Sequence, residues 1–249
     1  MAETRPENAA PQWQQLYFLS TREKTLVFVK RVEKAGFSAL VVTVDAAVGG
    51  LRERGARADF KFPSDVIWAN QGTSPSDWKA SAGQVNSRAT WEDVAWLCES
   101  TSLPVLVKGV MCGDDAVRAV RCGARGIIVS NHGGRQLDQG PSTAAVLPHV
   151  VAALWEAGIG EQCDVLVDGG IRRGSDVVKA LALGAKAVLV GRPVVWGLAV
   201  DGVEGVHDVL TKLKREVEVT MQLCGQVSAQ GVDGQVMAAG HREHPWPGR

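Results

Sequence analysis

An imidazole and a guanidinium directly follow an apolar run in the stretch GIIVSNHGGRQLD. His132 can exchange a proton near neutral pH, and Arg135 carries a planar fork that matches a carboxylate. Tyr17, Asp45 and Lys108 also follow apolar runs. If these runs are parallel strands of one sheet, the five side chains meet at its carboxyl edge, where Asp45 could stabilise a protonated imidazole. A lone histidine at a strand end is more often structural, but this convergence predicts proton transfer on a small carboxylate.

Two glycine motifs follow the last two apolar runs: DGGIRRG, which begins at Asp168, and VGRP, which contains Gly191. In α/β barrels, the loops after the last two strands commonly bind a phosphate through backbone N–H groups and a helix N-terminus. Arg172 and Arg192 add charged donors suited to phosphate oxygens. The glycines could instead form tight turns alone, but the paired motifs favour a phosphorylated cofactor or substrate.

Short, continuous runs of Val, Ile and Leu indicate strands that are buried on both faces, as in parallel sheets. Helical segments separate the runs, and a left-handed glycine is expected to end three of them, at Gly36, Gly123 and Gly184. The expected strands are Gln14–Leu19, Ala39–Val44, Val105–Lys108, Gly126–Ser130, Asp164–Val167 and Ala187–Val190. The expected helices are Arg22–Ala35, Trp91–Glu99, Gly113–Arg121, Thr143–Ala157, Arg173–Leu183 and Val203–Leu223.

Strict alternation of strand and helix predicts either an α/β barrel or a doubly wound sheet. The barrel is favoured, because the polar residues fall at or just after strand carboxyl ends, the face where barrel enzymes place their chemistry. A doubly wound sheet should carry a glycine fingerprint after its first strand, and none is present there. The expected class is therefore α/β, a TIM (β/α)8-type barrel, with residues 46–89 as a long lid-like loop.

Bulk composition disfavours several partners. The chain has 249 residues and a formal net charge of zero, so it offers no net positive charge to a nucleic acid. No apolar stretch approaches the roughly 18 residues that span a bilayer, and the N-terminus lacks the apolar core of a secretory signal. The five cysteines are widely spaced without a C-x-x-C pair, which predicts free thiols in a reducing compartment and no metal site.

Several of these motifs together resemble one family. Its members are the FMN-dependent 2-hydroxy acid oxidases and dehydrogenases, typified by glycolate oxidase, lactate oxidase and flavocytochrome b2. The similar segments are SNHGGRQLD, LPVLVKGV, TVD with an arginine seven residues on, and DGGIRRGSDVVKALALGAKAVLVGRPVVWGLAV. The resemblance, which runs from about Trp13 to Cys224, implies FMN as cofactor, a small 2-hydroxy acid as substrate, and O2 or another electron acceptor.

The resemblance also implies roles for the matched residues at the substrate. His132 would be the active-site base, and Asp45 would pair with it. Arg135 and Arg52 would hold the substrate carboxylate, while Tyr17 would hydrogen-bond the substrate.

Other matched residues would contact the cofactor. Lys108 would lie beside the flavin ring, where its charge stabilises the anionic reduced flavin. The remaining flavin, ribityl and phosphate contacts would come from Gln15, Thr43, Ser130, Asp168, Gly169, Gly170, Arg172, Gly191 and Arg192.

The sequence also departs from the family. Ala46 and Ala47 replace the usual Thr-Pro, and Leu51 replaces an arginine. The six strands match the family's third to eighth, and a barrel without its first two strands leaves two unpaired edges. We therefore expect a chain that is aggregation-prone or dependent on a partner, and that binds FMN much more weakly than a full-length relative, with little or no turnover.

The expected domain organisation has three parts. An N-terminal extension covers residues 1–12, a partial FMN-binding barrel covers 13–224, and a tail covers 225–249. Two alternatives stay open. One is a truncated isoform or fragment of such an enzyme with weak FMN binding and no turnover, and the other is a phosphate-binding barrel without redox chemistry, which the SNHGGR motif disfavours. A homo-oligomer is expected, without a membrane span and without a recognised targeting signal, inside the cell in the cytoplasm or peroxisome.

Overall fold

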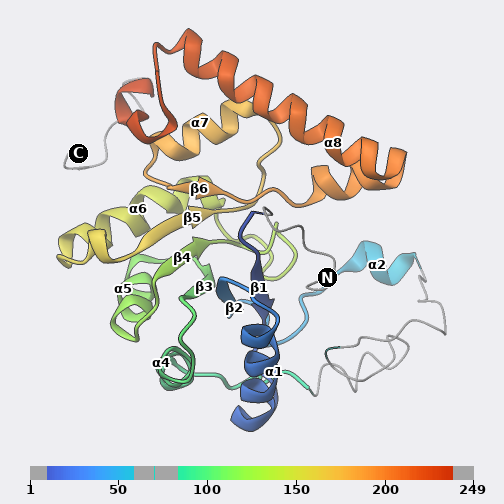
Figure 1. The fold of residues 1–249 in the computed structure, drawn as a ribbon, viewed down its shortest axis with the longest axis vertical. Coiled ribbons are helices and arrows are strands. Elements are labelled where there is room, and N and C mark those ends of the chain that lie inside the picture. Colours follow the sequence, from blue (N-terminus) through green and yellow to red (C-terminus); the bar gives the residue numbers. More distant parts are fainter. Residues whose placement is uncertain (1–9, 59–69, 71–83, 238–249) are drawn as a thin grey trace.

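Parallel strands follow one another around a curved sheet in the order β1-β2-β3-β4-β5-β6 (Figure 1). The computed structural model describes residues 10–58, 70 and 84–237. The strands are β1 (Trp13–Leu16), β2 (Ala39–Thr43), β3 (Val105–Val110), β4 (Gly126–Val129), β5 (Asp164–Val167) and β6 (Ala187–Val188). Every neighbouring pair is parallel. The predicted class, an incomplete (β/α)8-type barrel, is confirmed.

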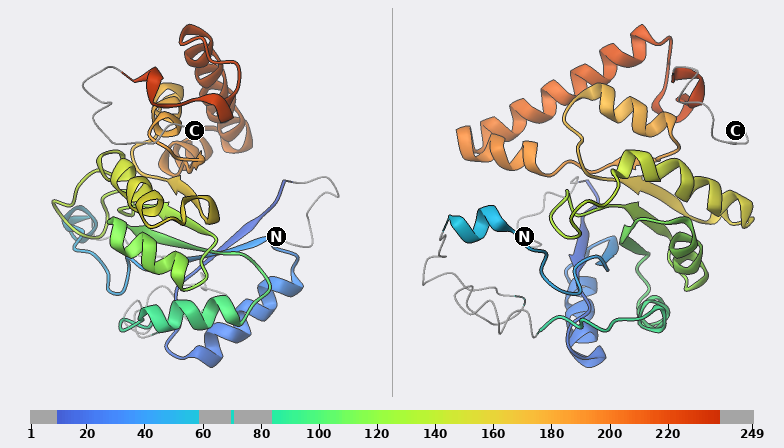
Figure 2. Two further views of the ribbon diagram at one scale, coloured as in Figure 1. Left: turned by 90° about the vertical axis from the view of Figure 1, so that its left-hand side faces the viewer. Right: turned by 180° about the vertical axis from the view of Figure 1, so that it is seen from behind.

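Helices lie along the outer side of this sheet (Figures 1 and 2). The predicted C′ glycines are confirmed, because Gly36, Gly123 and Gly184 have φ values of 77°, 99° and 97°. A residue with a Cβ rarely adopts this left-handed conformation, so glycine allows each helix to turn back into the next strand. These helices are α1 (Arg22–Lys34), α4 (Trp91–Glu99), α5 (Gly113–Arg121), α6 (Thr143–Glu156), α7 (Gly174–Ala182) and α8 (Arg192–Leu223). The short helix α2 (Glu53–Arg57) lies apart from them, on the loop after β2 (Figure 1).

Side chains alternate between the two faces of each strand, and this alternation separates two cores. One core fills the space between the sheet and the helices, and it includes Val42, Val107 and Ile127. The other core contains strand residues and one residue just after β6, and it lies inside the curve of the sheet: Ala39, Val41, Leu106, Ile128, Leu166 and Leu189. Polar residues two positions further along β2 and β3, Thr43 and Lys108, therefore also face inward, at the carboxyl end.

Several element boundaries differ from the sequence expectation. β1 ends at Leu16, because Leu19 forms an antiparallel bridge with Val85 and leaves the parallel ladder. β6 ends at Val188, and α8 begins well before its expected start at Val203. The α8 backbone leaves helical geometry at residues 201–202, so α8 consists of two helical segments.

Two sheet edges are unpaired among the described residues. β1 pairs with β2 alone, and β6 pairs with β5 alone. Apolar side chains are exposed on β1 and on α8, which follows β6: Trp13 is 45% exposed and Trp196 is 52% exposed. Unpaired backbone groups and exposed apolar surface thus occur together in this part of the molecule.

The described helices give no candidate for a membrane span, since none is both long enough and apolar enough to cross a bilayer. The predicted lid-like loop, 46–89, lies largely outside the described residues. Its described part contains the short helix α2, which the sequence reasoning did not anticipate.

Candidate active site

Inward-facing polar side chains form a layer at the carboxyl ends of the strands. Thr43 and Ser130 are buried, and the Gln15 side-chain amide donates to Thr43 Oγ1 at 3.0 Å. Tyr17 and Asp45 follow on the same inward positions of the first two strands, two residues further along each chain. The alternation of the strands therefore places the predicted residues on one side of the sheet, above its inner apolar core.

His132 and Asp45 form a close pair between the loops after β4 and β2. Their Nδ1 and Oδ1 atoms are 2.7 Å apart, and the side chains are 18% and 12% exposed. Because Nδ1 faces the carboxylate, Nε2 is the ring atom left to meet a substrate. Asp45 Oδ2 is buried and has no hydrogen-bond partner among the described residues. This geometry suits an imidazole that gains a proton and is then stabilised by the carboxylate.

The turn that carries His132 has an uncommon backbone. His132 has a φ of 58°, in the left-handed region that few non-glycine residues adopt, and Gly133 and Gly134 continue it at 65° and 73°. Ser130 Oγ accepts from the His132 N–H at 3.1 Å, and Asn131 Oδ1 accepts from the Gly134 N–H at 3.1 Å. These bonds hold a strained turn in place, a feature that clusters at functional sites.

Lys108 lies between two other polar residues of the layer. Its Nζ donates to Ser130 Oγ at 2.8 Å and lies 3.4 Å from Asp168 Oδ2. The second carboxylate oxygen of Asp168 is buried and without a hydrogen-bond partner among the described residues. The unsatisfied carboxylate oxygen is suited to a ligand hydroxyl or N–H donor, and the partly buried ammonium is suited to a ligand acceptor.

Gly109 brings the loop after β2 close to β3. Its φ is 104°, and a Cβ there would lie 2.6 Å from Asp45 Cβ. The register between β3 and β4 shifts at this point. Glycine is therefore required for Asp45 to sit against the strand that carries Lys108.

The phenol of Tyr17 interacts electrostatically with Asp45, Arg135 and Arg52. Burial raises the pKa of the Tyr17 phenol above its ordinary value, and the negative charge of Asp45 raises it further. The positive charges of Arg135 and Arg52 lower the same pKa and partly offset this effect. The phenol thus stays protonated at neutral pH and can donate a hydrogen bond.

One cleft joins His132, the predicted base, to the glycine motifs. Its volume is about 430 Å³, and it lies at the carboxyl ends of the strands. The lining residues are Lys108, His132, Gly133, Arg135, Asp168, Gly169, Gly170, Ile171, Arg172, Leu189, Val190, Gly191, Arg192, Pro193 and Val195. The predicted phosphate loops and the predicted base therefore share one ligand-sized space.

The two helices that begin at this cleft differ at their N-termini. At α7, carboxylates already accept from backbone N–H groups: Asp176 binds those of Arg172 and Arg173, and Glu216 binds that of Gly174. At α8, no side chain caps the first turn. The N-terminus of α8 is therefore better suited to bind an anion than that of α7, because its first N–H groups have no side-chain acceptor and the helix dipole favours negative charge.

Both predicted phosphate-binding arginines have protein partners in this structure. Arg192 donates to the Gly133 carbonyl at 2.8 Å, and Arg172 lies 5.8 Å from the centroid of a Trp196 ring. Both side chains still border the cleft.

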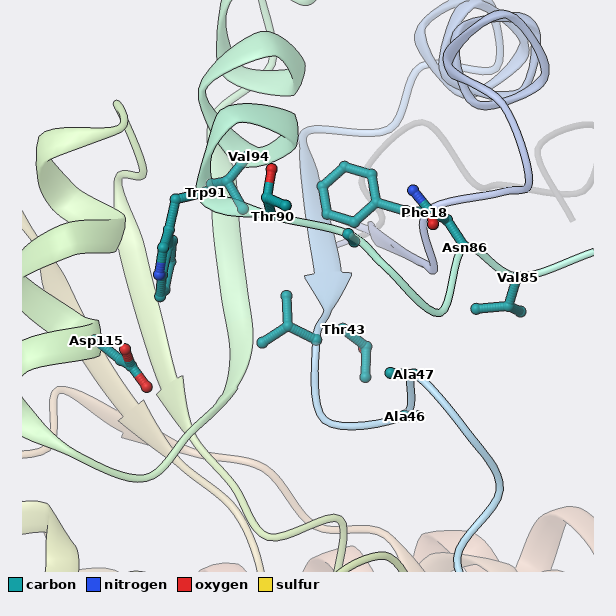
Figure 3. A pocket seen from close by; sticks show the side chains of 12 residues that line it. Phe18, Thr43, Ala46, Ala47, Val85, Asn86, Thr90, Trp91, Val94 and Asp115 are labelled. Atoms are coloured by element: carbon teal, nitrogen blue, oxygen red, sulfur yellow. The ribbon is translucent and has the colours of Figure 1, made fainter.

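A second pocket, of about 420 Å³, lies toward the helices beyond the end of β2 (Figure 3). Figure 3 shows Trp91 and Asp115 on one side of it and Val85 on the other, with Asp115 projecting from α5. Ala46 and Ala47 border this pocket, so their small side chains leave space open there. Its lining contains neither His132 nor Asp45, so the predicted proton transfer points to the first cleft.

Comparison with known proteins assigns the chain to a family. The fold and cleft define a barrel protein in which glycine loops and arginines border the same cleft as a histidine paired with an aspartate. The family model for FMN-dependent dehydrogenases matches residues 1–239. The chain belongs to this family of FMN-dependent dehydrogenases.

Named relatives agree with this assignment. L-lactate oxidase of Nostoc sp. is 46% identical over 89% of this chain and 62% of its own length. 2-Hydroxyacid oxidase 1 of Homo sapiens is 44% identical over 94% of this chain and 65% of its own length. A structure of mutant flavocytochrome b2 with pyruvate bound matches the whole chain and 60% of its own chain, with a TM-score of 0.85 and 35% identity. The chain thus spans less than two thirds of the length of these relatives.

Proposed function

We propose that this chain binds FMN and oxidises a small 2-hydroxy acid to the 2-oxo acid. The observation that carries the proposal is the cleft that His132 shares with the glycine loops suited to a phosphate, where His132 is paired with Asp45. Membership of the FMN-dependent dehydrogenase family supports FMN as the phosphorylated group. Residues 13–224 are assigned to the FMN-binding barrel domain, with residues 225–249 as a tail.

The residues present fit such a cofactor, which would accept two electrons from the substrate when bound. A Cβ built on Gly170 or Gly191 would meet nothing within 4 Å, so a phosphate can approach the backbone there. The buried, unpaired Asp168 oxygen can accept from a ribityl hydroxyl. The cofactor contacts assigned are Gln15, Thr43, Lys108, Ser130, Asp168, Gly169, Gly170, Arg172, Gly191 and Arg192.

The chain's own residues account for substrate binding and proton transfer. Arg135 and Arg52 bind the carboxylate, and Tyr17 donates a hydrogen bond to the substrate. Conversion of the CH–OH group to C=O releases two electrons and two protons. His132 Nε2 accepts one proton, and the other would accompany the two electrons to the cofactor. Asp45 stabilises the imidazolium through Nδ1.

Oxidase names among the relatives support O2 as the final electron acceptor. A relative from Arabidopsis thaliana is named a peroxisomal (S)-2-hydroxyacid oxidase, which supports a peroxisomal location for this chain. A homo-oligomer and an intracellular location, cytoplasmic or peroxisomal, stay predictions.

The test uses the purified full chain. We expect a flavin absorbance spectrum after incubation with FMN, and bleaching of that spectrum when L-lactate or glycolate is added without oxygen. Arg192→Ala should weaken FMN binding by about 10- to 100-fold through loss of a charged donor, whereas Arg118→Ala, on the exposed side of α5, should not. Failure of every 2-hydroxy acid to bleach bound FMN would contradict the proposed reaction.

A further inference from the structure

The side chain of Gln136 joins the loop after β4 to the loop after β2. Its Nε2 donates to the carbonyl oxygens of Asp45 and Val48 at 3.0 and 2.9 Å. Its Oε1 accepts from the Gly50 N–H at 3.2 Å and from Arg52 Nη2 at 3.4 Å. A primary amide has two N–H donors and one oxygen with two lone pairs, so these four bonds use its full capacity.

The four partners lie on one short segment that carries two proposed functional residues. Asp45 begins this segment and pairs with His132, while Arg52 ends it and is assigned to the substrate carboxylate. Gln136 itself directly follows Arg135, the other carboxylate anchor. One amide therefore connects both ends of the first loop to the turn that presents the base and the second arginine.

The backbones of the two loops are also in close contact. A Cβ on Gly50 would lie 2.7 Å from Gln136 Cα and nearer still to the Arg135 carbonyl oxygen. Glycine at this position therefore lets the segment lie directly against the turn. Close contact alone leaves the segment able to slide, whereas the four directed hydrogen bonds set one register between the loops.

We propose that Gln136 is a positioning residue that sets both the Asp45–His132 pair and the separation of Arg52 from Arg135. We call the four hydrogen bonds of the Gln136 amide the clamp. Its catalytic consequence rests on the proposed function, but the hydrogen bonds themselves are a property of the chain alone. Displacement of reacting groups by about 1 Å can lower a rate by about 100-fold, so such a clamp affects both the rate and substrate binding.

Two variants divide the clamp into its halves. Gln136→Leu removes all four hydrogen bonds at similar side-chain size. Gln136→Glu keeps an acceptor for Gly50 and Arg52 but loses both donors, and its carboxylate then faces the Asp45 and Val48 carbonyls. Gln162→Leu, at an exposed glutamine before β5, is the matched control.

The first measurement needs no cofactor. Hydrogen exchange of the Gly50 amide, followed by NMR on the full chain, should be slow in the wild type, in Gln136→Glu and in Gln162→Leu. In Gln136→Leu it should be faster by about tenfold, because the acceptor is lost. Equal exchange in the wild type and Gln136→Leu would show that the clamp does not exist.

The second measurement separates binding from rate in the FMN-loaded chain. Pyruvate affinity, read from flavin absorbance, should fall about tenfold in Gln136→Leu and stay within about threefold of wild type in Gln136→Glu. Flavin reduction by L-lactate should slow by about 10- to 100-fold in both variants, with FMN affinity unchanged. Wild-type reduction rates in both variants would overturn the positioning role.

The two proposals fail separately. A wild-type chain that protects Gly50 but is never reduced contradicts the proposed function and leaves the clamp supported. A wild-type chain that is reduced by L-lactate, with Gly50 unprotected, supports the proposed function and overturns the clamp.

Discussion

His132 combines a left-handed backbone and a carboxylate partner with a place in the cleft that the glycine loops border. The imidazole is proposed to act on the substrate, while the phosphate is proposed to bind the glycine loops and Arg192. His132→Ala should therefore lower the rate of flavin reduction by about 10²- to 10⁴-fold. FMN affinity, measured by flavin fluorescence, should stay nearly unchanged.

An exposed histidine on α8 provides the control for that variant. His207→Ala should reduce flavin at the wild-type rate, because His207 lies outside the cleft that the glycine loops border. A His132→Ala protein that retains most of its reduction rate would show that another group takes the proton.

The half-buried thiol of Cys98 and the buried thiol of Cys163 make the free energy of unfolding depend on pH. Burial raises the pKa of Cys98 to about 11 and that of Cys163 to about 12, whereas unfolded thiols ionise near pH 8.5. The unfolded chain therefore loses these protons first as the pH rises. Their contribution to the free energy of unfolding should be complete below about pH 8.5 and be lost progressively up to about pH 12.

Urea unfolding between pH 8 and 10.5 checks this pH dependence. The free energy of unfolding should fall more steeply with pH in the wild type than in Cys163→Ala. Cys224→Ala, which removes an exposed thiol, should follow the wild-type slope. Parallel slopes for all three proteins would contradict the assigned shift.

At the scale of elements, the two segments of α8 cross at a pair of glycines. A Cβ on Gly197 would lie 2.5 Å from the Gly205 carbonyl oxygen, and the reverse contact is closer. Alanine normally favours a helix over glycine by about 1 kcal/mol, but here the added methyl group must separate the segments. Gly197→Ala should lower the melting temperature by roughly 2–10 °C, measured by calorimetry.

The matched control is a helical glycine with space around it. A Cβ on Gly55, in α2, would meet only the Arg52 Cβ at 3.8 Å, which is ordinary contact. Gly55→Ala should therefore leave the melting temperature unchanged or raise it. Because the first segment of α8 begins beside Gly191, Gly197→Ala should also weaken FMN binding.

The elements that the sequence predicted best are those with a local cause. Buried β-branched runs and C′ glycines placed β2 to β5 and the ends of α1, α5 and α7 to within two residues. β1 was predicted too long, because Val85, distant in sequence, draws Leu19 out of the ladder. The first segment of α8 was missed, because the apolar run VVWGLAV contains a glycine and shows no polar face.

In the candidate site too, residues with a local sequence signal could be predicted, and residues that depend on contacts between distant segments could not. Strand-end residues such as Asp45 and Lys108 could be predicted, since strand alternation fixes which side they face. Gln136 could not, because a single amide in a polar loop has no periodic pattern, and its partners appear only when two loops meet. The close approaches at Gly50 and Gly109 are equally tertiary, although an isolated glycine in a strand run is a known sign of such contacts.

At the scale of the whole molecule, the described sheet has two unpaired edges. β1 and β6 each present an unpaired row of backbone groups, with exposed Trp13 and Trp196 close by in sequence. We expect the part of human 2-hydroxyacid oxidase 1 that this chain does not match to raise the melting temperature and the FMN occupancy when fused to it. An unchanged melting temperature, with a flavin-loaded, active monomer before fusion, would contradict this expectation.

Alternation along the strands also determines which sequence changes the fold can absorb. Val41 and Thr43 face the interior of the sheet while Val42 faces the helices. Deletion of one residue within β2 would exchange these two sets, burying Asp45 among the helix contacts and turning a valine toward the cleft. Among relatives, insertions and deletions should thus lie between strands, or change a strand by two residues at a time. The length of each strand is therefore tied to the functional residue at its end.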